Sequence, residues 1–233
     1  MLTTATNRQL LKLLQICDSN FPVGAFSHSY GMETYLREDI IKDRVTFENC
    51  IKVYLKGQFM YTDGLGIRLV YEALNANKLD RLWEIDQQIT VQSMAKETRE
   101  GTKKVGQRML QMILDLYDDD VLKSYEERIK KDLSHGHPAL VFALAMYGMG
   151  ISEKDAILCH SFSTVSTLVQ NGVRAIPLGQ KDGQMILRDI GDFLIEMYEE
   201  IQGLDEEDFG MTIPGLEIAQ MRHETLHFRL FMS

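Results

Sequence analysis

Apolar residues recur along most of this chain at spacings of three and four, which is the period of an amphipathic α-helix. Near the N-terminus, Leu10, Leu13, Leu14 and Cys17 follow the pattern i, i+3, i+4, i+7. Further helices are predicted at about 27–37, 46–58, 67–74, 79–94, 97–117, from 120, from 138, 152–169, 186–201 and 216–228. Strand signals are weak, and no linker divides the chain. The pattern predicts one all-α globular domain, residues 1–233, of roughly eight to ten helices.

Capping residues place several of the predicted helix starts. Thr46 is predicted to cap the helix that carries Phe47, and the carboxylates of Asp118–Asp120 favour the positive end of a helix dipole. Pro138 suits the first turn of a helix, and Ser152-x-x-Asp155 resembles a capping box. Gly64 and Gly66 are expected to loosen the stretch between two helices, while Gly203 closes a later one.

The segment Asn171–Gln184 interrupts this helical pattern most strongly. Its helix breakers are Gly172, Pro177, Gly179 and Gly183. Its polar side chains include Arg174, Gln180 and Gln184. The segment has no nucleophile, no Cys or His and no phosphate-loop pattern. We therefore predict a shaped, polar joint for recognition rather than for chemistry.

Composition narrows the class of partner. A net charge of −9 argues against nucleic acid, and no apolar run reaches the roughly 18 residues of a membrane helix. Three widely spaced cysteines, with no signal-peptide pattern, fit a reducing cytoplasm. From Asp189 to Met221 there are ten acidic residues and no Lys or Arg. These residues fit a solvated helix face and an acidic loop. The alternative is a surface that favours a basic or cationic partner.

Residues His223–His227 match the zinc-hydrolase motif H-E-x-x-H. On a helix, this spacing puts two imidazoles on one zinc and supplies Glu224 as a general base. A catalytic zinc needs a third protein ligand, and no good ligand follows in Phe228–Ser233. A third ligand from upstream, such as His135 or His137, would be unusual. A zinc hydrolase using His223, Glu224 and His227 is therefore an alternative hypothesis only.

The spacing of Gly101 and Gly106 is that of a nucleotide P-loop, but Gln107-Arg108 follow instead of Lys and a hydroxyl residue. The stretch also lies within a helical pattern. We expect no bound nucleotide, no cofactor and no resident metal. The order of residues leaves open whether His135, His137 and the acidic stretch guide a cation. The apolar tail Phe228–Ser233 is expected to dock on its own core or in a partner's groove.

Segments along nearly the whole chain resemble the UreF family of urease accessory proteins. They are Phe21–Glu33, Lys96–Arg99 with Gly106, His137-Pro138, Val173–Gln184, Pro214–Ala219, and His223-Glu224 with Arg229–Ser233. In the family pattern His227 falls on a variable position, so the H-E-x-x-H match looks coincidental. Tyr30, Met32 and Lys181 are small departures from the family pattern.

The resemblance implies an all-α, non-enzymatic scaffold for inserting nickel into apo-urease. It implies a homodimer that binds a UreD/UreH-type accessory protein and recruits the GTPase UreG. The predicted UreD/UreH-type surface comprises Arg174, Pro177, Gly179, Gln180, Gln184, Arg229, Leu230 and Phe231, with a tail at about 228–233 that orders on this partner. Candidates for the dimer or GTPase surface are Phe21, Pro22, Gly24, Phe26, Ser29 and Glu33. A generic helical adaptor is the remaining alternative.

Overall fold

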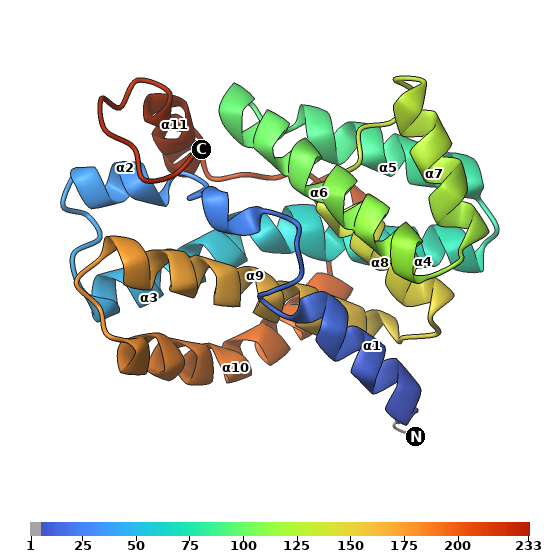
Figure 1. Cartoon of the computed structure of the whole chain (residues 1–233), viewed down its shortest axis with the longest axis horizontal. Coiled ribbons are helices and arrows are strands. Elements are labelled where there is room, and N and C mark those ends of the chain that lie inside the picture. Colours follow the sequence, from blue (N-terminus) through green and yellow to red (C-terminus); the bar gives the residue numbers. More distant parts are fainter. Residues whose placement is uncertain (1–5) are drawn as a thin grey trace.

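The computed structural model describes residues 6–233, and within them it contains helices and connecting segments but no strand (Figure 1). The α-helices are α1 Asn7–Cys17, α2 Met32–Arg37, α3 Arg44–Tyr54, α4 Leu65–Asn75, α5 Leu79–Val91, α6 Lys96–Leu116, α7 Asp120–Lys130, α8 Pro138–Gly148, α9 Glu153–Ala175, α10 Gln180–Gln202 and α11 Pro214–His223. Short 3-10 turns lie at Ala25–Ser27 and Glu206–Asp208. A π-helical segment, Leu55–Gly64, joins α3 to α4 without a break. The all-α prediction is confirmed.

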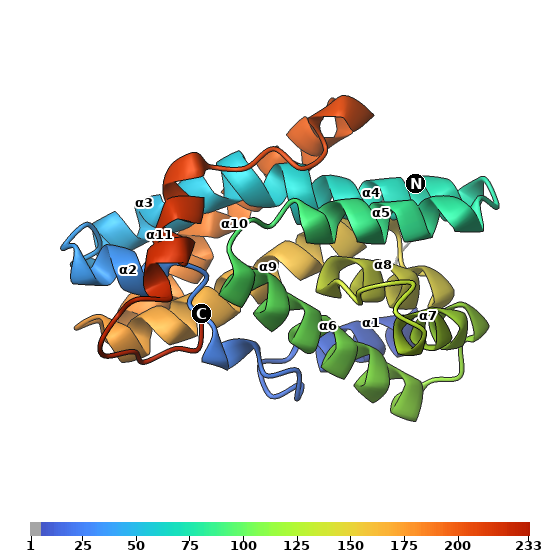
Figure 2. The ribbon, with the colours of Figure 1, turned by 90° about the horizontal axis from the view of Figure 1, so that it is seen from above.

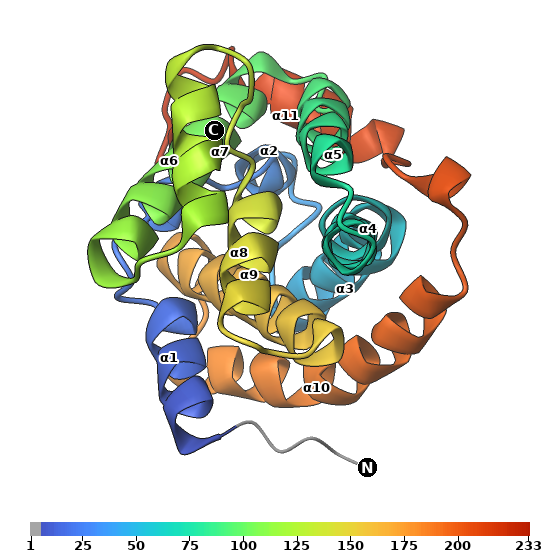
Figure 3. The same ribbon diagram turned by 90° about the vertical axis from the view of Figure 1, so that its right-hand side faces the viewer.

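Helix α8 forms the centre of the molecule, with α4, α6 and α9 packed around it (Figure 3). Every residue from Ala139 to Met146 is buried. The segment is apolar on all sides, as expected for a helix with no solvent face. Pro138 starts the helix as predicted, and the side chain of His137 caps it by accepting from the Ala139 amide at 3.3 Å.

Helices α9 and α10 pack side by side along one edge of this centre (Figure 1). Ser152 caps α9 and Gly203 follows α10, both as predicted. However, α9 continues to Ala175 and α10 already begins at Gln180, so the predictions that Gly172 and Gly183 break the helices are wrong. A Cβ at Gly172 would overlap the ring of Phe47. This glycine therefore permits close contact between α9 and α3 rather than a turn.

The two glycines that resemble a P-loop lie inside α6, so they cannot form a phosphate-binding loop there. A Cβ at Gly101 would come within 2.7 Å of the His28 ring, and one at Gly106 would overlap the Gly136 carbonyl. Both positions are buried. Close packing against neighbouring loops explains the spacing of these glycines.

Other helix boundaries differ from prediction for local backbone reasons. The predicted helix at 27–37 is divided, because Tyr30 and Gly31 have φ angles of 52° and 90°. Asp43, rather than Thr46, is the N-cap of α3, and the two residues form a capping box. Gly64 is the last residue of the π-helical segment and Gly66 lies in α4, so the chain stays helical through both glycines.

The last helix ends at His223, whereas the periodicity predicted continuation to Phe228. Within residues 6–233, none of the helices combines the length and apolar character needed to span a bilayer.

Candidate partner-binding surface

The C-terminal tail lies against the loop between α1 and α2 (Figure 2). The Met232 amide donates to the Ser27 carbonyl at 2.7 Å, and the amides of Ser29 and Tyr30 donate to the Ser233 carbonyl oxygen at 2.5 and 3.2 Å. The Ser29 hydroxyl donates to the same oxygen at 2.9 Å. These bonds fix the path of the tail along the loop.

Glu33 anchors the tail from beneath. This residue, on α2, is only 1% exposed, and its carboxylate accepts from the amides of Leu230 at 2.8 Å and Phe231 at 3.1 Å. A third contact joins its Oε2 to His223 Nε2 at 3.1 Å. Backbone amides that bond a carboxylate stabilise its charge, and a buried carboxylate is costly without such partners. Glu33 thus holds the tail in a defined conformation.

His223 connects Glu33 to a second carboxylate. Its ring is fully buried, and Nδ1 lies 3.3 Å from Glu97 Oε2. Both ring nitrogens therefore lie within hydrogen-bonding distance of carboxylate oxygens. Arg229 also donates to both Glu97 oxygens, at 2.8 and 2.9 Å. Two acidic and two basic side chains therefore form one network beneath and beside the tail.

The same network changes the titration of Glu97. Partial burial by itself would raise the pKa of Glu97, but hydrogen bonds from Arg229 and His223 outweigh it and hold the pKa below its usual value. The carboxylate is therefore ionised at neutral pH, when it pairs with the Arg229 guanidinium.

Alternate residues of the tail point in opposite directions. Phe231 is 6% exposed and helps to wall a small apolar cavity together with Phe47 and Ile176. In contrast, Phe228, Leu230 and Met232 are 81%, 63% and 64% exposed. Large apolar side chains on a braced segment are typical of an interaction surface. We call these three side chains the tail face.

The turn between α9 and α10 lies at the same end of the molecule as the tail (Figures 1 and 2). Exposed residues of the predicted joint are Arg174, Pro177, Gly179, Gln180 and Gln184. Phe231 packs near Ile176, so the two predicted partner segments approach each other on the inner side. The three polar side chains, Arg174, Gln180 and Gln184, face solvent rather than brace the fold.

The candidates near the N-terminus are divided between surface and interior. Pro22 is exposed and Phe26 is half-buried, whereas Phe21, Ser29 and Glu33 are buried. Gly24 has a φ of 80°, and a Cβ there would overlap the Arg108 guanidinium. Ser29 and Glu33 contact the tail directly, a role that their place in the sequence did not predict.

The geometry excludes the H-E-x-x-H zinc site. His223 is the last residue of α11, so Glu224 and His227 lie beyond the helix that the motif requires. Both nitrogens of His223 are occupied by Glu33 and Glu97, and His227 is exposed. Across residues 6–233, no cluster of three or more His, Cys, Asp or Glu side chains is placed to hold a metal ion. The zinc-hydrolase alternative is therefore wrong.

Comparisons with known proteins identify the family. The UreF family model matches residues 41–191. A "Urease accessory protein UreF" from Lachnoclostridium phytofermentans is 47% identical over 96% of this chain and 98% of its own length. One from a Bacillus species is 47% identical over 97% and 99%, and one from Ureaplasma urealyticum is 43% identical over the full length of both. The chain belongs to the UreF family.

The two kinds of match cover different parts of the candidate surface. The UreF family model includes the α9–α10 turn but stops before the tail and begins after Glu33. The full-length UreF relatives extend over nearly all of this chain. The surface formed by the tail and the turn therefore falls largely within the region shared with these relatives.

Proposed function

We propose that this chain is a non-enzymatic scaffold required for inserting nickel into apo-urease. In this proposal it binds a UreD/UreH-type accessory protein, recruits the UreG-type GTPase and regulates its activity in the cytoplasm. Membership of the UreF family and the names of the full-length relatives support a role in urease maturation. The role would be to couple binding equilibria, because a scaffold favours the partner state that it binds more tightly.

The tail face is the observation that carries this proposal. Phe228, Leu230 and Met232 expose apolar side chains, although the segment that bears them is fixed by Glu33 and the loop Ser27–Tyr30. A pre-ordered apolar surface loses little conformational entropy when a partner binds. We assign this face, together with the exposed side of the α9–α10 turn, to the UreD/UreH-type partner.

A homodimer needs a second surface, and the predicted candidate segment from Phe21 to Glu33 buries Phe21, Ser29 and Glu33. Helix α1 exposes Leu10, Leu11 and Leu14, at 47%, 67% and 57%. Apolar side chains grouped in this way favour contact with another protein, and the proposal uses this face for a second copy of the chain. Leu11→Ser with Leu14→Ser is expected to convert the dimer to monomer in light scattering, with unchanged helical content.

Replacing the tail face tests the partner assignment. In the variant Phe228→Ser, Leu230→Ser, Met232→Ser, we expect co-purification with the UreD/UreH-type protein to be lost and the circular dichroism spectrum to be unchanged. Val45→Ser with Val53→Ser is the matched control, since both valines are exposed apolar residues on α3. Retained binding in the tail variant would contradict the assignment.

Nickel loading tests the wider role. In cells that lack this chain, urease is expected to contain little nickel by elemental analysis, and the wild-type chain should restore it. Fully loaded urease in the deletion strain would overturn the proposal and favour a generic helical adaptor. The tail variant should behave like the deletion if the UreD/UreH-type contact is required.

A further inference from the structure

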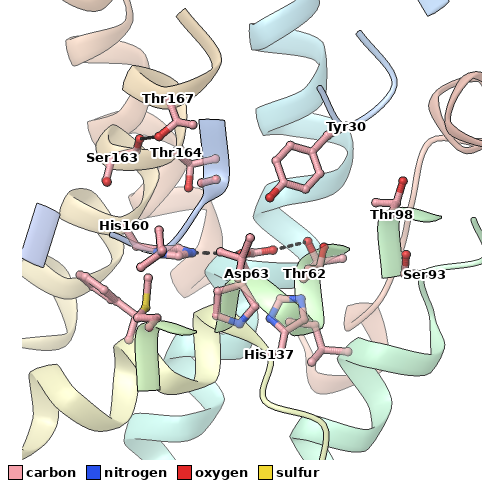
Figure 4. Close-up of a pocket in the computed structure, with 18 of the residues that line it drawn as sticks. Tyr30, Thr62, Asp63, Ser93, Thr98, His137, His160, Ser163, Thr164 and Thr167 are labelled. Atoms are coloured by element: carbon pink, nitrogen blue, oxygen red, sulfur yellow. Dashed lines mark hydrogen bonds and ion pairs between the residues drawn. The ribbon is translucent and has the colours of Figure 1, made fainter. Parts of the chain in front are cut away.

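A cavity of about 160 Å³ lies between the π-helical segment, α9 and the start of α6 (Figure 4). Asp63 and Thr62 come from the π-helical segment, His160 and Thr164 from α9, and Thr98 from α6. The lining extends to Asp18, which is exposed at the end of α1. The remaining walls are mostly apolar and include the rings of Tyr30 and Phe142.

The π-helical winding contributes directly to this cavity. Gln58, Thr62 and Asp63 all line it, at spacings of four and five residues. In an α-helix a residue at i+5 turns away from residue i, but i→i+5 hydrogen bonding brings the two onto one face. π-Helical turns are rare and frequently occur at functional sites. Here the winding places a carboxylate and an amide on the same wall.

Unpaired polar atoms are concentrated around this cavity. Of seven buried side-chain N or O atoms without a hydrogen-bond partner in residues 6–233, four belong to its lining: Gln58 Oε1, Thr90 Oγ1, Gln92 Oε1 and Thr98 Oγ1. Thr90 and Thr98 are 4% and 5% exposed. Each unpaired buried polar atom costs about 1–3 kcal/mol. Rotation of these side chains toward the cavity would let a polar occupant with hydrogen-bond donors satisfy several of them together.

Asp63 gives the cavity a negative charge. His160 Nε2 lies 3.0 Å from Oδ1, and Thr62 Oγ1 lies 3.2 Å from Oδ2. Burial alone would raise the pKa of Asp63, but the contact with His160 and the nearby His137 hold it below its usual value. A carboxylate has about four lone-pair positions, so Asp63 retains capacity for another donor.

Nearby basic side chains do not take up the remaining hydrogen-bonding positions of Asp63. Burial lowers the pKa of His137, which favours its neutral form. Arg99 donates to the Ser93 carbonyl at 2.7 Å, and Lys103 lies 3.4 Å from Glu100. The lining thus combines the half-buried carboxyl group of Asp63 and the buried one of Glu217 with amide and hydroxyl acceptors. The described residues gather no three metal-ligating side chains at this or another site, which favours an organic cation over a metal ion.

We propose that this cavity binds a small organic ammonium ion, with the ammonium group on Asp63 and Gln58 and the hydrocarbon part against Tyr30 and Phe142. The ammonium supplies three N–H donors to a wall rich in acceptors. Its carbon chain occupies the apolar part, and its charge is favoured beside aromatic faces. Tyr30 contributes its ring to this site and its amide to the tail, but the exposed tail face is not part of the site. The proposal does not depend on the proposed role in urease maturation.

Titration with n-butylammonium and its neutral counterpart n-butanol, followed by saturation-transfer NMR at neutral pH, tests the site. In the full wild-type chain, butylammonium should bind at least about tenfold more tightly, because the ammonium forms a charge-assisted hydrogen bond. In Asp63→Asn, this preference should fall to about onefold. Gln58→Leu removes the second proposed acceptor and should weaken butylammonium binding by about two- to tenfold, as expected for one hydrogen bond.

Asp189→Asn is the matched control, since this aspartate pairs with Arg44 and Arg188 on the surface. It should leave both affinities unchanged, and circular dichroism will show whether each variant is folded. Equal binding of amine and alcohol to the wild type would overturn the proposal. So would saturable Ni²⁺ binding that Asp63→Asn abolishes while butylammonium does not bind, or a cavity that holds ordered water only.

Discussion

The C-terminal tail carries apolar side chains into solvent, whereas the cavity beside the π-helical segment keeps polar side chains inside the fold. Apolar side chains are usually buried and polar side chains usually exposed, so both arrangements cost free energy in the isolated chain. The two regions differ in whether their polar atoms have hydrogen-bond partners. Around the tail, Glu33, His223 and Glu97 are bonded to one another or to the main chain, while four polar atoms of the cavity are unpaired.

The tail and the cavity therefore offer different kinds of contact to a binding partner. The tail has its polar contacts complete and leaves apolar area for a protein surface. The cavity has apolar walls in place and leaves hydrogen-bonding capacity for a small polar solute. Substitutions that leave volume nearly constant can separate the two cases, because they change contacts without reshaping the core.

The largest effect is expected at Glu33. Glu33→Ala leaves the Leu230 and Phe231 amides and the His223 ring without their buried acceptor. Breaking such a buried charged cluster costs about 3–5 kcal/mol, measurable by urea unfolding. The exposed Glu38, which pairs with Arg222 at 3.0 Å, is the control, and Glu38→Ala should cost less than about 1 kcal/mol. Similar losses in both variants would show that Glu33 does not anchor the tail.

Two phenylalanines of the tail should give opposite results. Phe231→Ala removes a buried ring and should cost about 3 kcal/mol of unfolding free energy, since it empties an apolar site. Phe228→Ala should change stability by less than about 0.5 kcal/mol, because this ring is 81% exposed. Only the Phe228 variant should weaken UreD/UreH-type binding while the tail stays folded. If Phe228→Ala destabilised the chain, the tail face would instead be part of its own core.

Two buried threonines extend the comparison to the cavity. Thr34 Oγ1 donates to the Ala219 carbonyl at 2.7 Å, so Thr34→Val should cost about 1–3 kcal/mol. Thr98 has no such partner, and Thr98→Val should be neutral or stabilising by up to about 1 kcal/mol in the absence of ligand. Thermal unfolding of the two variants measures the difference. Equal losses would mean that Thr98 already has a partner.

Periodicity and capping residues predicted most of the fold from the sequence. They identified Pro138 and Ser152 as helix starts because these signals act within one turn of a helix. They failed at Gly172, whose role depends on Phe47, more than one hundred residues earlier in the chain. Continuous helix through Gly64 was missed because glycine weakens a helix only slightly when tertiary packing supports it.

The candidate surface was predictable in part. Pro177 and Gly179 located the turn between α9 and α10, whereas Gly172 and Gly183 lie inside helices; the tail was identified from its apolar composition. The link between Glu33, Glu97 and His223 was not predictable, because these residues lie on three helices and meet only after folding. His223 in particular was considered a zinc ligand because its spacing from His227 was visible, whereas its two carboxylate partners were distant in sequence.

The smallest effect concerns the pH dependence of the tail contacts. The pKa of Glu97 is depressed in the folded state, so its contribution to stability is present above the unfolded pKa and is lost as pH falls through the folded value. Glu97 is partly solvated, so we expect loosening of the tail rather than global unfolding. The amide NMR signals of Leu230 and Phe231 should shift as the pH falls from about 7 to about 3, and in Glu97→Gln the part of this shift due to Glu97 should disappear. An unchanged pH profile in that variant would show that the Arg229–Glu97 pair does not hold the tail, leaving Glu33 and the main-chain bonds as its anchors.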